Sequence, residues 1–367
     1  MDRIQIAAKP ERNYGIDLLR LVTMLFICIL HVCNKGGIVS RLSLETAPDH
    51  YRIAWFFEAL TFGSVNIFSM ISGYVGYNKK FKLSRPLSIW LELVFYTVIG
   101  TVLISRFCPQ IMPENGWLRA VMPVFNGEYW YMTAYFGMVI LSPLINAAVQ
   151  KMSTRSLGLT LLGIFVFFST IPAVMNVSVF GLSSGYSTVW LCIMYAAGGF
   201  LAKVKKPHPL PSFFVFLLCT VLTWLFKING VSRMLNYTSP TVVLAAAALT
   251  VTFAQINIRT KAGKAIIGFA APSALGIFII HVHTFSWDYL LKDAAASFVR
   301  DNAAMMTLKI LAMAALIFIG CFAVDVIRRG IFWLLHIKPL LNRMDRAIDS
   351  ILNKKTPPEP DGGEKSE

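Results

Sequence analysis

Charged residues are scarce in this sequence. Only 14% of its 367 residues are Asp, Glu, Lys or Arg, whereas 56% are hydrophobic. A soluble globular domain carries about 25% charged and about 45–50% apolar residues. The sequence therefore lacks the polar surface that a soluble protein of this length needs, and we expect its surroundings to be lipid.

Acidic residues are the scarcer of the two charged kinds. The 19 Asp and Glu residues stand against 34 Lys and Arg residues, which gives a formal net charge of +15. Such an excess could indicate nucleic-acid binding, but the positive residues lie in short segments between apolar runs, where the positive-inside rule places them. We expect membrane lipids, or an acidic cytosolic ligand, as the anionic partner, and no nucleic acid.

Several motifs of soluble proteins are missing. The sequence has no P-loop and no glycine pattern typical of a Rossmann fold. Its six cysteines form no CxxC pair, so neither a zinc site nor a disulfide framework is indicated, and we interpret them as small buried hydrophobic residues. Any chemistry must therefore take place within or beside membrane helices.

Long apolar runs are what the sequence has in abundance. A membrane-spanning helix needs about 20 mostly apolar residues, and about ten segments approach that requirement. They cover residues 16–32, 53–77, 87–107, 129–149, 157–175, 186–202, 212–226, 240–256, 265–290 and 304–327. Arg20 interrupts the first run and no A-x-A cleavage site follows it, so we interpret this run as a helix and not as a signal peptide.

The distribution of positive charge predicts the orientation of these helices. Most Lys and Arg residues lie in the N-terminal flank, in every second loop and in the C-terminal tail, which indicates an even number of spans with both termini in the cytoplasm. We predict an all-α fold with one transmembrane domain, residues 1–340. Residues 341–367 would form a cytoplasmic tail, whose last part, NKKTPPEPDGGEKSE, has the composition of a disordered segment.

The first span, GIDLLRLVTMLFICILHV, carries one polar face. Arg20 and His31 are eleven residues apart, about three helical turns, so they share a face with about 16 Å between them along the axis. Asp17 and Asn34 extend the same face. A charged group inside a span costs at least a few kcal/mol and is a functional candidate. Alternatively, Arg20 pairs with Asp17 or reaches the headgroups, and His31 binds a neighbouring helix.

Two further histidines lie in the outer half of the ninth span, APSALGIFIIHVHTF. A spacing of two places His281 and His283 on different helix faces, so we expect at most one of them to meet His31. Three histidines could suggest zinc, but metal ligands on one helix prefer spacings that share a face. We therefore predict no metal.

Two glutamates lie near the ends of predicted spans. Glu58, near the outer end of the second span, could orient a histidine ring as the carboxylate of a catalytic triad does. Glu92, near the inner end of the third span, could neutralise Arg20 or a basic loop residue. Either could also be an isolated interfacial carboxylate.

The fourth span opens with the aromatic residues Tyr129 and Trp130, directly after Glu128. Aromatic residues are common at membrane interfaces, and composition alone favours that interpretation. The same side chains could instead stack on a sugar ring.

Taken together in chain order, these segments resemble the acyltransferase-3 family of integral membrane acyltransferases. Its hallmark, an Arg and a His separated by ten residues, matches Arg20 and His31. NIFSMISGYVGY resembles the family's phenylalanine-rich helix that ends in Ser-Gly-aromatic, and GEYWYMTAYFGMVILSPL resembles its W-Y…L-x-P segment. ALGIFIIHVH resembles its late G-I-hydrophobic-H segment. The chain departs from the family at Glu128, where relatives often have His, and in its lysine-rich first cytoplasmic loop.

The resemblance implies transfer of an acyl group, commonly acetyl from acetyl-CoA, to a hydroxyl of a cell-envelope polysaccharide or lipid-linked glycan at the bacterial plasma membrane. Arg20 would contact the donor. His31 would act as general base or carry the acyl group transiently. The other residues expected to take part are Glu58 and His281 beside His31, Lys79, Lys80 and Arg85 on the donor, and Glu128, Tyr129 and Trp130 on the acceptor.

Two other functions fit the same polar residues. A transporter or flippase for an amino acid or glycolipid would also need polar groups inside a bundle of helices, and would form no bond. A structural subunit of an envelope polysaccharide machine is the third possibility. Formation of an ester from labelled acetyl-CoA distinguishes the enzyme from both.

Overall fold

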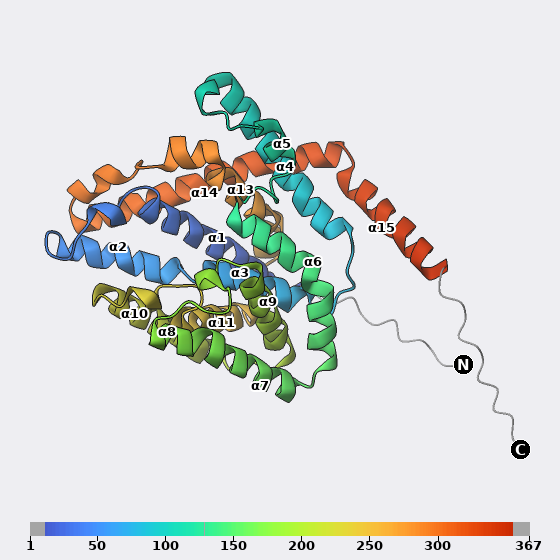
Figure 1. Cartoon of the computed structure of the whole chain (residues 1–367), viewed down its shortest axis with the longest axis horizontal. Coiled ribbons are helices and arrows are strands. Elements are labelled where there is room, and N and C mark those ends of the chain that lie inside the picture. The colour runs from blue at the N-terminus through green and yellow to red at the C-terminus, as the bar shows by residue number, and fades with distance from the viewer. Residues whose placement is uncertain (1–11, 128, 355–367) are drawn as a thin grey trace, which may run out of the picture.

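The computed structural model describes residues 12–127 and 129–354, and within these ranges it contains helices and loops but no strand. The predicted all-α fold is thereby confirmed. The α-helices are α1 (Tyr14–Asn34), α2 (Pro48–Thr61), α3 (Ser64–Gly76), α4 (Ser84–Phe107), α5 (Gly116–Val121), α6 (Trp130–Lys151), α7 (Thr154–Phe165), α8 (Ile171–Met175), α9 (Thr188–Lys203), α10 (Pro209–Ile228), α11 (Pro240–Ala254), α12 (Lys261–Ala270), α13 (Ala274–Val282), α14 (Ala303–Leu334) and α15 (Ile337–Lys354). Figure 1 shows their arrangement.

Eight helical segments of the described chain are long and apolar enough to cross a membrane. They are Tyr14–Arg41, Pro48–Gly76, Ser84–Phe107, Trp130–Lys151, Thr154–Met175, Pro209–Ile228, Lys261–Val282 and Ala303–Leu334. Two shorter apolar helices, α9 and α11, coincide with the sixth and eighth predicted spans. The chain is therefore a membrane protein, while the count of ten spans and the cytoplasmic location of both termini stay predictions.

The ninth predicted span, residues 265–290, is not one helix. Its first part is α12, which passes through a short 3₁₀ turn, Ala271–Ser273, into α13. Pro272 lies in that turn and has no backbone N–H to continue the α-helical pattern. After α13 the backbone becomes extended at His283, with ψ 138°, and a π-helical turn, Ser286–Leu291, follows. His281 therefore lies in the last turn of a helix.

Helix α1 lies at the centre of the bundle. It contacts α2, α3, α11, α12, α13 and α14, and Figure 1 shows it between α2 and α14. The Asn13 side chain begins α1 by accepting a hydrogen bond from the backbone N–H of Ile16 at 3.0 Å, and its amide donates to the carbonyl of Ala254 at 2.9 Å. The polar face of α1 is thus placed among packed helices.

Helices α3 and α9 approach each other through two glycines. A Cβ atom on Gly73 of α3 would lie 1.8 Å from the carbonyl oxygen of Tyr195, and one on Gly198 of α9 would lie 2.0 Å from that of Met70. Small residues let helix backbones approach closely in membrane proteins. At the point where the two backbones approach, each helix therefore needs a residue without a side chain, Gly73 in α3 and Gly198 in α9.

A buried ion pair joins α4 to α14. Arg328 donates to Glu92 at 3.0 Å and to Asp325 at 2.8 Å, and the Tyr96 hydroxyl donates to Asp325 at 2.6 Å. Glu92 therefore neutralises Arg328 and not Arg20. Because the charge of Arg328 is balanced inside the bundle, α14 can continue past the predicted end of the tenth span at residue 327, and it ends at Leu334.

The expected tail begins with a helix. Residues 337–354 form α15, which contacts α4 and α14. Most of the segment predicted to be disordered, residues 353–367, lies outside the described residues, which end at 354.

Candidate active site

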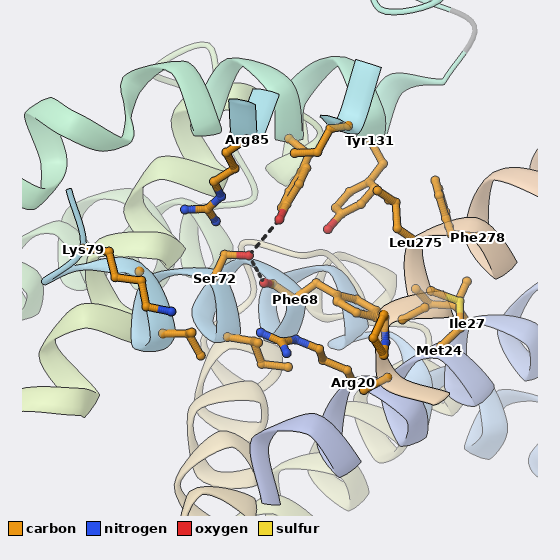
Figure 2. A pocket seen from close by; sticks show the side chains of 18 residues that line it. Arg20, Met24, Ile27, Phe68, Ser72, Lys79, Arg85, Tyr131, Leu275 and Phe278 are labelled. Carbon is orange, nitrogen blue, oxygen red and sulfur yellow. Dashed lines mark hydrogen bonds between the residues drawn. The ribbon is translucent and has the colours of Figure 1, made fainter. Parts of the chain in front are cut away.

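A cavity of about 390 Å³ lies beside the N-terminal half of α1; we call it the Arg20 cavity. Besides Arg20 it is lined by Lys79, from the loop between α3 and α4, and by Arg85, from the first turn of α4. Figure 2 shows these three side chains around one part of the cavity, with Ile27 and Phe278 at another. The cavity thus has a cationic region and an apolar region.

Arg20 forms an ion pair with a buried carboxylate. Its guanidinium donates to the carboxylate of Asp17, one turn earlier on α1, and Asp17 also accepts from Arg12. The pairing expected as an alternative for Arg20 is therefore present, although Arg20 still lines the cavity. Because two guanidinium groups share one carboxylate, and a guanidinium has five N–H donors, Arg20 retains donors for a further anion.

Positive charge is crowded in this cavity. Partial burial, together with the guanidinium groups of Arg85 and Arg20, lowers the pKa of Lys79. An anionic ligand would relieve that repulsion. Lys80, which was expected to act with Lys79 and Arg85, is not among the lining residues.

A second cavity, of about 380 Å³, lies beside the C-terminal end of α1; we call it the His31 cavity. Its lining includes His31 and the predicted acceptor residues Tyr129 and Trp130. Phe62 and Tyr237 complete an aromatic wall, since their rings stack at 4.8 Å and Tyr237 lies 5.8 Å from Trp130. Glu128, the third predicted acceptor residue, lies outside the described residues.

A chain of hydrogen bonds fixes the tautomer of His31. The Nδ1 atom of His281 lies 2.6 Å from the carbonyl oxygen of Ile277, which can only accept, so Nδ1 carries the proton. In a neutral His281 ring, Nε2 is then an acceptor, and His31 Nδ1 donates to it across 2.9 Å. The remaining nitrogen of a neutral His31 ring, Nε2, is therefore unprotonated and basic.

Only one of the two late histidines meets His31, as the spacing predicts. His281 is buried and bonds His31, whereas the ring of His283 packs against Gly100 of α4. The edge of Trp287, from the segment after α13, also faces the His31 ring at 4.7 Å between centroids.

Glu58 lies in α2, and the structure gives no hydrogen bond between its carboxylate and the His31 ring. The partner of the His31 ring is His281, and the orienting role proposed for Glu58 is filled by the carbonyl of Ile277 acting through His281. Glu58 itself is 1% exposed, and its Oε1 has no hydrogen-bond partner among the described residues. Its participation in catalysis stays a prediction.

The Arg20 cavity and the His31 cavity share part of their lining, which we call the constriction. Three residues line both cavities, namely Ile27 of α1, Tyr131 of α6 and Phe278 of α13. Ile27 lies between Arg20 and His31 along α1. A slender group passing between these three side chains would travel from the cationic cavity to the histidines.

Several site residues were not identified in the sequence. Phe278 and Ile27 look like ordinary apolar residues of a span, and Tyr237 lies in a loop with no helical pattern. Tyr131 directly follows Tyr129 and Trp130 in the sequence, and an aromatic residue at the end of a span is typical of a membrane interface. Trp287 is the one of these residues that the sequence could have indicated, because it lies four residues after His283, about one helical turn, in the same predicted span.

Comparison with protein families identifies one domain. A family model described as an acyltransferase domain, that of the acyltransferase-3 family, matches residues 13–326. The match includes both cavities and leaves α15 outside. No curated protein and no solved structure matches the chain. Within residues 12–127 and 129–354, no group of three His, Cys, Asp or Glu side chains could hold a metal ion.

Proposed function

Because this chain belongs to the acyltransferase-3 family, we propose that it transfers an acyl group, commonly acetyl, from cytosolic acyl-CoA to a hydroxyl of a cell-envelope glycan. The observation that carries the proposal is the His31–His281 hydrogen bond beside a cavity that adjoins a cationic one. The bacterial plasma membrane is the corresponding location.

The charge of the Arg20 cavity supports an acyl-CoA donor. Coenzyme A is a polyanion of the cytosol, and the predicted orientation places Arg20, Lys79 and Arg85 on the cytoplasmic side. Guanidinium groups bind phosphate in a bidentate manner. The thioester end of the donor would extend along α1 toward the constriction, over the roughly 16 Å that separates Arg20 from His31.

The histidine pair supports general base catalysis. The glycan hydroxyl attacks the thioester carbonyl carbon while His31 Nε2 accepts the hydroxyl proton. The new C–O bond forms, the C–S bond breaks, and the proton returns from His31 to the departing coenzyme A thiolate. His281, which accepts the Nδ1–H bond, stabilises the imidazolium that exists between these two proton transfers.

The aromatic wall of the His31 cavity supports a sugar acceptor. Trp130, Phe62 and Tyr237 present ring faces and edges beside His31. Asp288 also lines this cavity, where it pairs with Lys35 at 2.7 Å, so polar groups for hydroxyls lie close to apolar rings. A glycan hydroxyl at this position would be near the basic nitrogen.

The constriction between two cavities also favours a second function, that of a transporter. One experiment separates the two. The purified protein in lipid nanodiscs is incubated with radiolabelled acetyl-CoA and candidate envelope glycans, and ester formation is measured. We expect a base-labile ester in the glycan fraction. Release of coenzyme A without ester, or labelled substrate movement in vesicles without ester, would contradict the acyltransferase.

A further inference from the structure

A third and larger hollow lies against the Arg20 cavity; we call it the α15 groove. Its volume is about 1180 Å³, and it lies between the N-terminal part of α4, the end of α14 and the start of α15. Arg85, Ile89, Tyr135 and Pro272 line both the groove and the Arg20 cavity. The two spaces are therefore adjacent and share Arg85.

The groove is cationic. Its lining includes Arg85, Arg328, Arg329 and Lys338, and none of its lining residues is acidic. Arg328 is already balanced by Glu92 and Asp325. Among the residues that the structure describes, no salt bridge joins Arg85, Arg329 or Lys338 to a carboxylate, so no acidic side chain balances these three charges. Arg329 donates to the carbonyl of Phe269 at 2.7 Å and to the hydroxyl of Ser273 at 3.0 Å, which leaves Arg85 and Lys338 as the main cations for a ligand.

The groove also offers an aromatic surface. Trp333, at the end of α14, is 77% exposed and lines the groove. Phe269 and Phe332 line it as well. Flat aromatic side chains beside several cations suit a ligand that combines phosphate groups with a purine ring.

A specific contact holds α15 in place as a wall of the groove. The chain turns at His336, whose φ is 53°, and α15 then returns toward the start of α4. There Asp345 accepts hydrogen bonds from the backbone N–H of Ser84 at 3.0 Å and from the Ser84 hydroxyl at 2.5 Å. A buried carboxylate thus caps the N-terminus of the helix that carries Arg85. Figure 1 shows α15 in red at one side of the bundle.

We propose that the α15 groove binds the nucleotide half of the acyl-CoA donor, so that the C-terminal helix forms part of the donor site. This inference rests on the proposed function. The Arg20 cavity, about a third the volume of the groove, suits the slender pantetheine arm, whereas the groove suits the adenosine with its phosphates. Arg85, shared by both, would contact the diphosphate that joins the two halves.

The test uses Lys338→Ala and Lys338→Glu, with Arg343→Ala as the matched control. Lys338 and Arg343 are both exposed basic residues of α15, but only Lys338 lines the groove. We expect KM for acetyl-CoA to rise roughly tenfold in Lys338→Ala, as for loss of one charge-assisted phosphate contact, and further in Lys338→Glu. KM for acetyl-pantetheine, which lacks the nucleotide, should not change, and Arg343→Ala should behave as wild type for both donors.

Binding of adenosine 3′,5′-bisphosphate to the solubilised full-length protein, measured by calorimetry, gives a readout that does not need turnover. We expect binding by the wild type and weaker binding by both Lys338 variants. If KM for acetyl-CoA and binding of adenosine 3′,5′-bisphosphate were both unchanged in Lys338→Glu, the groove would not be the nucleotide site. The proposed function would still hold in that case, provided that the wild type forms the ester. A wild type that forms no ester from acetyl-CoA would overturn the proposed function and this inference with it.

Discussion

The tautomer of His31 is set by a residue 250 positions away in the sequence. The hydrogen bond to His281, and that from His281 to the carbonyl of Ile277, leave the basic lone pair on His31 Nε2. His31 thus combines a tautomer that two neighbours enforce with a position on the lining of the His31 cavity.

We predict that His31→Ala and His31→Gln abolish acylation without abolishing folding. Loss of a general base typically costs about a hundredfold to ten-thousandfold in rate. His281→Ala should cost less, on the order of tenfold, because it removes support for His31 and not the base itself. Acylation by purified variants of equal membrane yield and thermal stability is the measurement.

The matched control for His31 is His208→Ala. His208 lies on the exposed start of α10, and its substitution should leave acylation unchanged. Near-normal acylation in well-folded His31→Ala would remove the catalytic assignment, and the transporter function would then be favoured.

We predict that Arg20→Ala weakens use of the acyl donor. The expected rise in KM for acetyl-CoA is on the order of tenfold to a hundredfold, because a charge-assisted contact to phosphate is lost. Arg20→Lys should recover only part of the loss, since an ammonium cannot make the bidentate contact of a guanidinium.

Arg155→Ala, at an exposed arginine near the start of α7, is the control for the loss of one positive charge. Unchanged donor KM and turnover in Arg20→Ala would show that Arg20 serves only to balance Asp17.

The polar residues of α1 could be predicted from the sequence because a helix converts spacing directly into a shared face. Arg20 and His31 were found in this way. The partner of His31 could be narrowed to one of two histidines but not chosen, because the choice depends on how α13 packs against α1. Tyr237 and Phe62, from distant segments, carry no local signal at all.

At the scale of elements, the contact between α3 and α9 is held by two glycines, and it positions Ser72 of the Arg20 cavity. The Ser72 hydroxyl lies 3.1 Å from that of Tyr135 on α6, so a shift of α3 would be transmitted to the lining of the Arg20 cavity.

We predict that Gly73→Ala and Gly198→Ala destabilise the protein. The added Cβ would meet backbone oxygen atoms of the neighbouring helix, which cannot move aside as a side chain can. Overpacking of this kind costs typically about 1–3 kcal/mol, occasionally more. Thermal denaturation in detergent should show a lower midpoint for both variants.

Gly320→Ala is the control, because a Cβ at Gly320 of α14 meets nothing within 4 Å. It should be neutral or slightly stabilising, since alanine is favoured over glycine inside a helix by roughly 0.5–1 kcal/mol. Equal midpoints for Gly73→Ala, Gly198→Ala and Gly320→Ala would contradict the packing argument.

Most helices could be predicted from hydrophobic run length, whereas breaks inside a run could not. Residues 265–290 are apolar enough to suggest one span, yet Pro272 and the extended backbone at His283 divide them. The continuation of α14 past residue 327 could not be predicted, because the sequence shows the charge of Arg328 but not its ion pairs with Glu92 and Asp325.

For the molecule as a whole, the membrane topology remains a prediction. The side of the membrane that each cavity faces depends on it. Positive charge in alternate loops predicts that both termini lie in the cytoplasm. Reporter proteins fused after Arg343, within the described chain, and after Lys355 should both report a cytoplasmic location. A periplasmic signal at either position would reverse the assignment of the Arg20 cavity to the donor side.

The family and the membrane location of the whole molecule could be predicted from the sequence. Composition and the order of motifs along the chain do not depend on how the helices pack. The two cavities, the constriction and the α15 groove could not be predicted from the sequence, because each is formed by side chains from three or more segments that are distant along the chain. Arg85 illustrates the difference: the sequence marks it as basic, and only the fold places it between two spaces.

The constriction also bears on the leakage of ions across the membrane. A membrane that stores energy as an ion gradient cannot tolerate a continuous water-filled path, and the Arg20 and His31 cavities together would come close to one. Ile27, Tyr131 and Phe278 interrupt it with apolar and aromatic surface, and narrow hydrophobic constrictions lose their water. The three side chains would thus form a hydrophobic barrier to ion permeation. An uncharged acyl group could cross it where a proton or a sodium ion could not.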